Sequence, residues 1–271
     1  MKWFEQHMNF QLGDFIMLTS GLKALSEMWG SPINVYFNTS VVRDLYQDCD
    51  FINTIHKRPP GVPFASSLFS SYKHGEYRAE RLSKQESMQS CFFRHIAVKK
   101  GYDKPMPHTY VDRPDGLKLE REEGKKYIAL FHGCLGDIFA DKKTIPISSL
   151  IFLVREVLEC GHIPVILGNK RDYKLYWKNV KLSDDRIINY LNKLSIRDSV
   201  SVLSQCDNFM SNDTGLYHVA SALKMEGLVL WNKTSPLKNA PSYSGVTQFF
   251  GKNLQPQAYN AAISSYLKGL S

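Results

Sequence analysis

A short polar turn, Asn212-Asp213-Thr214-Gly215, stands between a buried-type strand and a helix in the second half of the chain. Such a turn exposes backbone N–H groups and the positive end of a helix dipole, which together suit an anion such as a diphosphate. His218 follows Thr214 by four residues, so both side chains lie on one side of the helix and can reach a phosphate or a sugar. A plainer interpretation is also open, in which Asp213 or Thr214 only caps the helix and His218 is a solvated surface residue.

Strands and helices alternate through the second half of the chain. We expect strands at 127–131, 163–167, 209–211 and 228–231, and helices at about 150–158, 196–206, 216–223 and 258–270. Ser148 can cap the first of these helices and Gly161 can end it. This alternation indicates a parallel sheet, whose ligands bind at the carboxyl ends of the strands.

The first half begins with a similar strand, turn and helix. Alternating residues predict a strand at 8–12, and apolar residues at helical spacing predict a helix that Gly30 ends, with Asp14 at its N-cap. Further elements are expected in this half: strands at 33–37 and 51–55, and helices at 41–46 and about 86–99. The sequence therefore predicts two α/β domains, residues 1–122 and 123–271, facing a cleft.

The polar turn, followed by two residues, a His and a helix of small residues, resembles the ADP-heptose:lipopolysaccharide heptosyltransferases of glycosyltransferase family 9. Leu12-Gly13-Asp14 is similar to the opening turn of that family, and Thr234-Ser235-Pro236 to its late loop. The lead into the strand at 51–55 also agrees, so the likeness runs in register over about 8–60 and 127–241. The resemblance implies a glycosyltransferase of the GT-B fold, with two Rossmann-like domains whose parallel sheets face a central cleft.

Several features depart from the family pattern. Leu216 and Tyr217 replace a Pro-Met before the His, and Asn232-Lys233 replaces a Gly-Pro. The first strand is less uniformly apolar than usual, and the chain is shorter. These departures leave the sugar, heptose or another hexose-like sugar, open. The last helix has two places to pack, its own domain or the first domain.

The resemblance further implies inverting transfer that needs no metal, from a nucleotide-diphosphate sugar held mainly by the second domain to a hydroxyl of a glycan or lipopolysaccharide-type acceptor on the side of the first. Asp14, next to Gly13 at the cleft, is the candidate base, because a helix start favours the ionised carboxylate that a base requires. The alternative is a cap without a catalytic role. Lys143 is the candidate phosphate ligand, with Lys142 close behind it. Either is otherwise an ordinary solvated lysine.

Two other motifs are weaker. Asp48-Cys49-Asp50 spells the D-x-D with which other glycosyltransferases hold manganese, but it precedes a strand of the first domain, so we expect no metal there. The glycines at 133 and 136 lack the spacing of a dinucleotide-binding turn and indicate a loop near the donor. The five cysteines show no metal-binding spacing and fit buried thiols in a reducing cytosol.

The chain carries 34 Lys+Arg and 26 Asp+Glu, a formal net charge of +8 that attracts anions. Basic residues gather at 57–58, 73–81, 99–100 and 118–126. They form either a solvated face or a stripe for a polyanionic acceptor, such as lipid A core phosphates at a membrane surface or DNA. The sequence has no apolar run of membrane-spanning length and no signal-peptide pattern, so we expect a cytoplasmic protein that can lie against the inner face of a membrane.

Two rival functions remain open. The same chemistry could act on modified DNA bases or on protein, which a steep salt dependence of duplex DNA binding would indicate. Alternatively, a catalytically inactive domain of the same fold could bind nucleotides without turnover.

Overall fold

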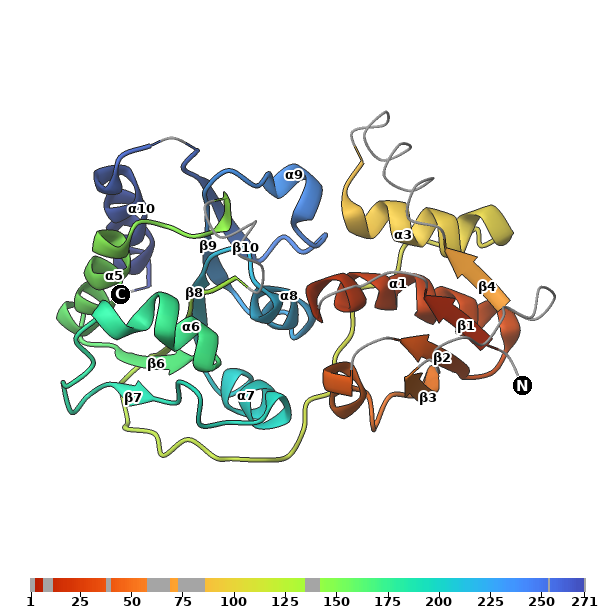
Figure 1. The fold of residues 1–271 in the computed structure, drawn as a ribbon, viewed down its shortest axis with the longest axis horizontal. Coiled ribbons are helices and arrows are strands. Elements are labelled where there is room, and N and C mark those ends of the chain that lie inside the picture. The colour runs from red at the N-terminus through yellow and green to blue at the C-terminus, as the bar shows by residue number, and fades with distance from the viewer. Residues whose placement is uncertain are drawn as a thin grey trace. The chain divides into compact units, whose positions relative to one another are not determined.

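The structure is a computed structural model that describes residues 3–6, 12–37, 40–57, 69–72, 86–134, 142–252 and 254–270. The chain divides into two compact units. The first comprises Met1–Asp112 and Leu237–Ser242, and the second comprises Arg113–Pro236 and Tyr243–Ser271. Each unit contains a parallel β-sheet with helices packed on it (Figure 1).

The sheet of the first unit has four strands in the order β3-β2-β1-β4, all paired in parallel. Its strands are β1 (Trp3–Gln6), β2 (Ile33–Phe37), β3 (Ile52–Lys57) and β4 (Phe69–Tyr72). The prediction of β2 is confirmed. The first described strand is Trp3–Gln6, whereas the strand predicted at 8–12 falls mostly on residues that the structure does not describe. Leu12 already belongs to helix α1 (Leu12–Trp29), and residues 7–11 lie outside the described part of the chain.

Helix α1 is apolar on most of its circumference, with Phe15, Ile16 and Leu18 fully buried, so it lies in the core of the first unit. It packs against α3 (Met88–Ile96), and a side chain on Gly21 would stand 3.1 Å from Ile96 Cβ. Gly21 therefore permits the close approach of the two helices. The described part of this unit also contains the 3₁₀ segments η1 (Ser40–Leu45) and η2 (Val98–Lys100).

The bounds of α1 show where Asp14 lies in the helix. Gly30 has a φ of 62° directly after the helix and ends it as predicted, because this conformation favours glycine. The helix begins at Leu12, so Asp14 lies inside the first turn and the prediction of an N-cap at Asp14 is wrong. A carboxylate in the first turn still interacts favourably with the helix dipole.

The sheet of the second unit has six parallel strands in the order β10-β9-β8-β5-β6-β7. They are β5 (Tyr127–Phe131), β6 (Ile163–Leu167), β7 (Ile188–Asn189), β8 (Asn208–Ser211), β9 (Gly227–Trp231) and β10 (Val246–Phe250). The described helices include α5 (Ile147–Glu159), α6 (Lys170–Leu175), η3 (Trp177–Asn179), α7 (Ile196–Leu203), α8 (Gly215–Ala222) and α10 (Pro256–Lys268). A short helix, α9 (Pro236–Asn239), begins at the last residue of a second-unit segment, and its other residues belong to the first unit.

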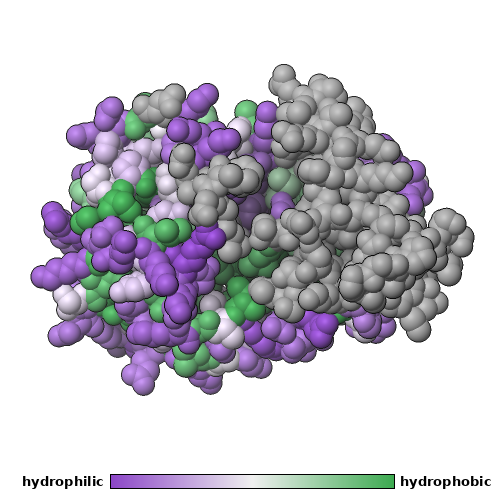
Figure 2. Space-filling model, viewed as in Figure 1, coloured by the Kyte–Doolittle hydropathy of each residue, from purple (hydrophilic) through white to green (hydrophobic). Residues whose placement is uncertain are grey.

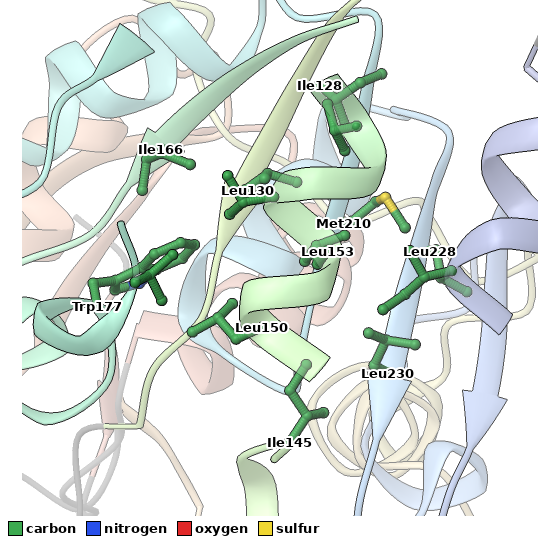
Figure 3. Packing of buried hydrophobic residues seen from close by; sticks show 14 of the residues in the cluster. Ile128, Leu130, Ile145, Leu150, Leu153, Ile166, Trp177, Met210, Leu228 and Leu230 are labelled. Atoms are coloured by element: carbon green, nitrogen blue, oxygen red, sulfur yellow. The ribbon is translucent and has the colours of Figure 1, made fainter. Parts of the chain in front are cut away.

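One face of this sheet carries the main core of the second unit (Figure 3). Leu150 and Leu153 of α5 pack with Ile128 and Leu130, which are alternate residues of β5 and so point to the same face. Pro146 occupies the N-cap of α5, and Ser148 lies inside the helix, so the prediction of Ser148 as the cap is wrong.

The C-terminal helix α10 completes the same core. Its buried residues Tyr259, Ile263 and Leu267 belong to the cluster around β5 and α5, and the helix contacts α5 and β9. Of the two places left open by the sequence, the contacts of this helix with α5 and β9 lie within its own unit. Burial of apolar surface accounts for this packing, because the apolar side of α10 covers the sheet face beside α5.

The surface is mixed in character. Figure 2 shows hydrophilic residues interspersed with smaller hydrophobic patches on the described part of the face in view. Within the described ranges, no helix has the length and apolar character needed to cross a membrane.

Candidate functional site

The strand order of the second unit reverses between β5 and β8. From β5 the chain proceeds outward through β6 to β7, then returns to β8 on the other side of β5 and proceeds to β9 and β10. The carboxyl ends of β5 and β8 lie side by side, with Phe131 paired to Ser211. In open α/β sheets this reversal is where ligands bind, and the polar turn that begins at Asn212 lies there.

Asn212 is fully buried and connects the ends of both strands. Its Oδ1 accepts a hydrogen bond from the backbone N–H of Gly133 (3.1 Å). Its Nδ2 donates to the carbonyl oxygens of Gly133 (3.0 Å) and Lys143 (3.0 Å). Both amide hydrogens are therefore used within the protein, and Asn212 serves the site by fixing backbone.

Asp213, Lys143 and His218 form a polar group beside this amide, in which Asp213 and His218 are buried and Lys143 is half-buried. Nζ of Lys143 lies 3.0 Å from Oδ2 of Asp213, and Nε2 of His218 lies 3.9 Å from Oδ1. Asp213 is 1% exposed and Lys143 27%. Burial by itself would raise the pKa of Asp213, but the imidazole of His218 and the ammonium of Lys143 outweigh it and hold the pKa at about 2. Asp213 is therefore ionised at neutral pH.

Helix α8 starts directly after this carboxylate. Thr214 is its N-cap residue and Gly215 its first helical residue, but the Thr214 side chain makes no capping hydrogen bond. Within the described part of the chain, Thr214 Oγ1 and His218 Nδ1 are buried without a hydrogen-bond partner. His218 is 5% exposed, so the interpretation of it as a solvated surface residue is wrong.

The aromatic residue before His218 belongs to the core. Tyr217 is fully buried, and its ring lies 5.8 Å from that of Trp231 and 6.2 Å from that of Phe209. Its hydroxyl accepts a hydrogen bond from Nε2 of Gln248 (3.1 Å). Tyr217 thus packs beneath α8 against Phe209 of β8 and Trp231 of β9.

His132 is a residue of this region to which the sequence analysis gave no role. It follows β5 and is 3% exposed, and burial lowers its pKa to about 3, so the ring is neutral. Its Nε2 accepts a hydrogen bond from the N–H of Ile145 (3.1 Å). In the sequence, His132 is a polar residue directly after a buried strand, which could have marked it as a candidate. Its partner Ile145 lies 13 positions away and cannot be identified from local pattern.

Gly133 lies where α6 approaches the end of β5. A side chain on Gly133 would come within 1.9 Å of Oδ1 of Asp172, the residue that completes the capping box of α6 with Asn169. A larger residue at position 133 would therefore displace the Asp172 carboxylate from its place in the capping box. Residues 135–141 lie outside the described part of the chain.

The other candidate residues are Gly13 and Asp14 in the first unit and Lys142 next to Lys143. Gly13 is buried and Asp14 half-buried in the first turn of α1, in the first unit. Lys142 is exposed. Asp48 and Asp50 are exposed, and within the described residues no group of three His, Cys, Asp or Glu side chains is placed to hold a metal.

A surface hollow of about 350 Å³ lies elsewhere in the second unit, between α5 and residues 180–187. Its lining is mainly apolar, with Ile151, Val154 and Leu158 on the side of α5. None of the candidate residues lines it, so the functional assignment rests on the carboxyl edge of the sheet.

Residues 67–267 match the model of glycosyltransferase family 9 (heptosyltransferase). The chain belongs to this family. Lipopolysaccharide heptosyltransferase 2 of Escherichia coli (strain K12) is 23% identical over 194 residues, which cover 65% of this chain and 55% of the relative. The chain thus spans about half the length of the curated relatives that it matches.

Solved structures agree with the family on the fold. A family 9 glycosyltransferase from Veillonella parvula superimposes with a TM-score of 0.79 at 12% identity, over 100% of this chain and 98% of that one. E. coli heptosyltransferase WaaC with ADP gives 0.65 at 12% identity over 100% of both chains. The iron-containing dodecameric glycosyltransferase TibC of enterotoxigenic E. coli gives 0.65 at 10% identity, over 99% of this chain and 74% of that one. The chain therefore has the GT-B fold, as the resemblance implied.

Proposed function

We propose that this protein is a glycosyltransferase that moves a heptose or similar sugar from a nucleoside-diphosphate donor to a hydroxyl of a lipopolysaccharide-type glycan. The observation that carries the proposal is the group formed by Lys143, Asp213 and His218 at the start of α8, on the reversal point of the second sheet. Family membership and the heptosyltransferase names of the relatives support the same donor and acceptor.

The second unit holds the donor. The first N–H groups of α8, which begins at Gly215, have no partners within the helix and suit the diphosphate. The half-buried ammonium of Lys143 adds positive charge, which stabilises the nucleoside diphosphate as it leaves. Thr214 Oγ1 and His218 Nδ1 supply polar atoms for a phosphate or sugar oxygen, and Lys142 adds exposed charge nearby.

The first unit supplies the base. The carboxylate of Asp14 takes the proton of the acceptor hydroxyl while the hydroxyl oxygen bonds to the anomeric carbon. The bond from that carbon to the diphosphate oxygen breaks on the opposite face, so the anomeric configuration inverts. The first turn of α1 favours the ionised form of Asp14 that this step requires.

Transfer proceeds without a metal in this proposal, because Lys143 and the helix amides carry the charge compensation. The polyanionic acceptor, at a membrane surface or in solution, meets basic residues of the first unit. Lys99 and Lys100 are exposed at η2, whereas the clusters at 58 and 73–81 lie outside the described residues. In the cluster at 118–126, Arg121 pairs with Asp207 (2.6 Å) within the second unit.

A transfer assay tests the proposal. The full chain is incubated with ADP-heptose and deep-rough lipopolysaccharide, with and without EDTA, and the product is analysed by mass spectrometry and by NMR of the new anomeric centre. We expect a heptosylated product of inverted configuration whose yield is unchanged by EDTA. Loss of activity with EDTA would contradict metal-free transfer, and ADP binding without turnover on glycan, DNA or protein acceptors would favour an inactive nucleotide-binding protein.

A further inference from the structure

The backbone at residues 142–145, which we call the strap, carries Lys143. Its carbonyl at Lys142 accepts hydrogen bonds from the backbone N–H groups of Lys233 (2.8 Å) and Thr234 (3.2 Å). The carbonyl of Lys143 accepts from Asn212 (3.0 Å). Successive polar groups of the strap are thus held by residues distant in sequence.

The other end of the strap is held in the same way. The carbonyl of Thr144 accepts a hydrogen bond from Nδ2 of Asn232 (2.9 Å), and the N–H of Ile145 donates to Nε2 of His132 (3.1 Å). The imidazole stays neutral because burial lowers its pKa to about 3, so it remains an acceptor at physiological pH.

The partners of the strap follow three neighbouring strands. His132 comes directly after β5, Asn212 after β8, and Asn232 and Lys233 after β9, and these strands are adjacent in the order β9-β8-β5. The strap therefore crosses the carboxyl edge of the sheet and is fixed at each strand. This arrangement sets the position of the Lys143 backbone, from which the side chain reaches Asp213 at 3.0 Å.

Asn232 and Lys233 follow β9 directly and make two of these contacts. The first contact needs a side-chain amide, which donates to the carbonyl of Thr144, and the second needs a backbone N–H, which donates to the carbonyl of Lys142 and which a proline lacks. Each contact can therefore be removed by a single substitution.

We propose that Asn232 and the N–H of Lys233 are positioning elements that pre-organise Lys143 for the donor diphosphate, an inference that rests on the proposed function. A lysine side chain has many rotamers, and holding its backbone in place leaves less freedom to lose when the ammonium binds a phosphate. The two groups act through Lys143, so their removal should weaken ADP binding only in a chain that still has Lys143.

The experiment compares Lys233→Pro with Lys233→Ala by calorimetric titration of ADP into the full chain. Both variants lose the same ammonium, but only the proline removes the N–H. We expect Lys233→Pro to bind ADP about fivefold more weakly than Lys233→Ala, the effect of one lost hydrogen bond. Asn232→Ala is expected to weaken ADP binding by a similar factor relative to the wild type.

Both comparisons are repeated in a Lys143→Ala background, which completes a double-mutant cycle. We expect the proline-to-alanine ratio and the Asn232→Ala effect to fall close to one there. Thermal unfolding of each variant is recorded in parallel. Steady-state kinetics should show a raised KM for the donor and a lowered kcat, because Lys143 also stabilises the diphosphate as it leaves.

The outcomes distinguish a failure of the positioning role from a failure of the proposed function. Equal affinities of Lys233→Pro and Lys233→Ala, or the same loss in both backgrounds, would overturn the positioning role while leaving donor binding intact. A Lys143→Ala variant with unaltered ADP affinity would overturn the positioning role as well, since it acts through that ammonium. A wild-type chain that does not bind ADP would overturn the proposed function itself.

Discussion

At the scale of single residues, the buried charges define the behaviour of the second unit. Lys143 and His218 hold Asp213 ionised at 1% exposure, so removal of either side chain leaves a carboxylate with one partner fewer in a site with little water. The side chain of Lys143 pairs with Asp213 in the structure, and in the proposed function it also binds the donor phosphates. Its substitution should affect both stability and binding.

We predict that Lys143→Ala weakens ADP binding by about 10- to 100-fold, because a charge-assisted contact with a phosphate is lost. It should also lower the free energy of unfolding by about 3 kcal/mol, because Asp213 keeps its charge with one partner fewer. Calorimetry and urea unfolding measure the two effects. Lys178→Ala is the matched control, since its side chain is exposed at η3 and has no assigned role in donor binding. Equal losses in the two variants would assign the phosphate contact differently.

The pH dependence of stability has two predicted components. The pKa of Asp213 is lowered from 3.8 to about 2, so the carboxylate stabilises the fold above pH 4 and this contribution is lost as the pH falls to 2. The pKa of His132 is lowered from 6.5 to about 3, so the unfolded chain binds the extra proton and stability falls as the pH decreases from 6.5 to 3.

The component from His132 is the easier to measure. Urea unfolding of the wild type between pH 6.5 and 4 should lose up to about 1.4 kcal/mol per pH unit more than that of His132→Asn, which cannot be protonated in this range. Parallel pH profiles of the two proteins would show that His132 is not buried in the neutral form.

At the scale of elements, continuous apolar runs were predicted most accurately. β5 and β6 lie at the predicted residues because each is buried on both faces. β10 was missed because most of its residues are exposed at the sheet edge, and β7 because it has two residues. Helix α6 was missed because its six residues are largely charged and its start is set by an asparagine capping box.

The site divides in a similar way. The polar turn, Asp213 and His218 could be identified from local spacing, since helix periodicity fixes which residues share a face. The contacts of Asn212 with Gly133 and Lys143 span 79 and 69 positions, and the contact of Asn232 with Thr144 spans 88. Local pattern carries no information on such pairings, because the sheet topology creates them.

We predict that Leu150→Ala destabilises the protein by about 2–5 kcal/mol, because it removes a fully buried side chain of α5 from the core around β5. Ile151→Ala, at the next position of the same helix, should cost less, since Ile151 is 36% exposed. Urea unfolding followed by circular dichroism gives both values. A similar cost for the two substitutions would contradict the orientation of α5.

The proposed mechanism divides the work between the two units: Asp14 of the first unit is the base, and the second unit holds the donor. Asp14→Asn should therefore reduce turnover by at least about 100-fold, because the amide cannot accept the acceptor proton. The Kd for ADP should stay within about twofold of the wild type, because 1.4 kcal/mol of binding free energy would be a tenfold change. Transfer assays and calorimetry on one preparation test the division. Turnover at the wild-type rate would remove Asp14 from the mechanism.

In the proposed function, the second unit binds a diphosphate at the start of α8, and every other role depends on this step. Calorimetric titration of the full chain with ADP and, separately, with adenosine isolates it, because the two ligands differ only in the phosphates. We expect measurable binding of ADP, weakened by salt, and binding of adenosine at least about 100-fold weaker. Equal affinities for the two ligands, or no binding of ADP, would contradict it.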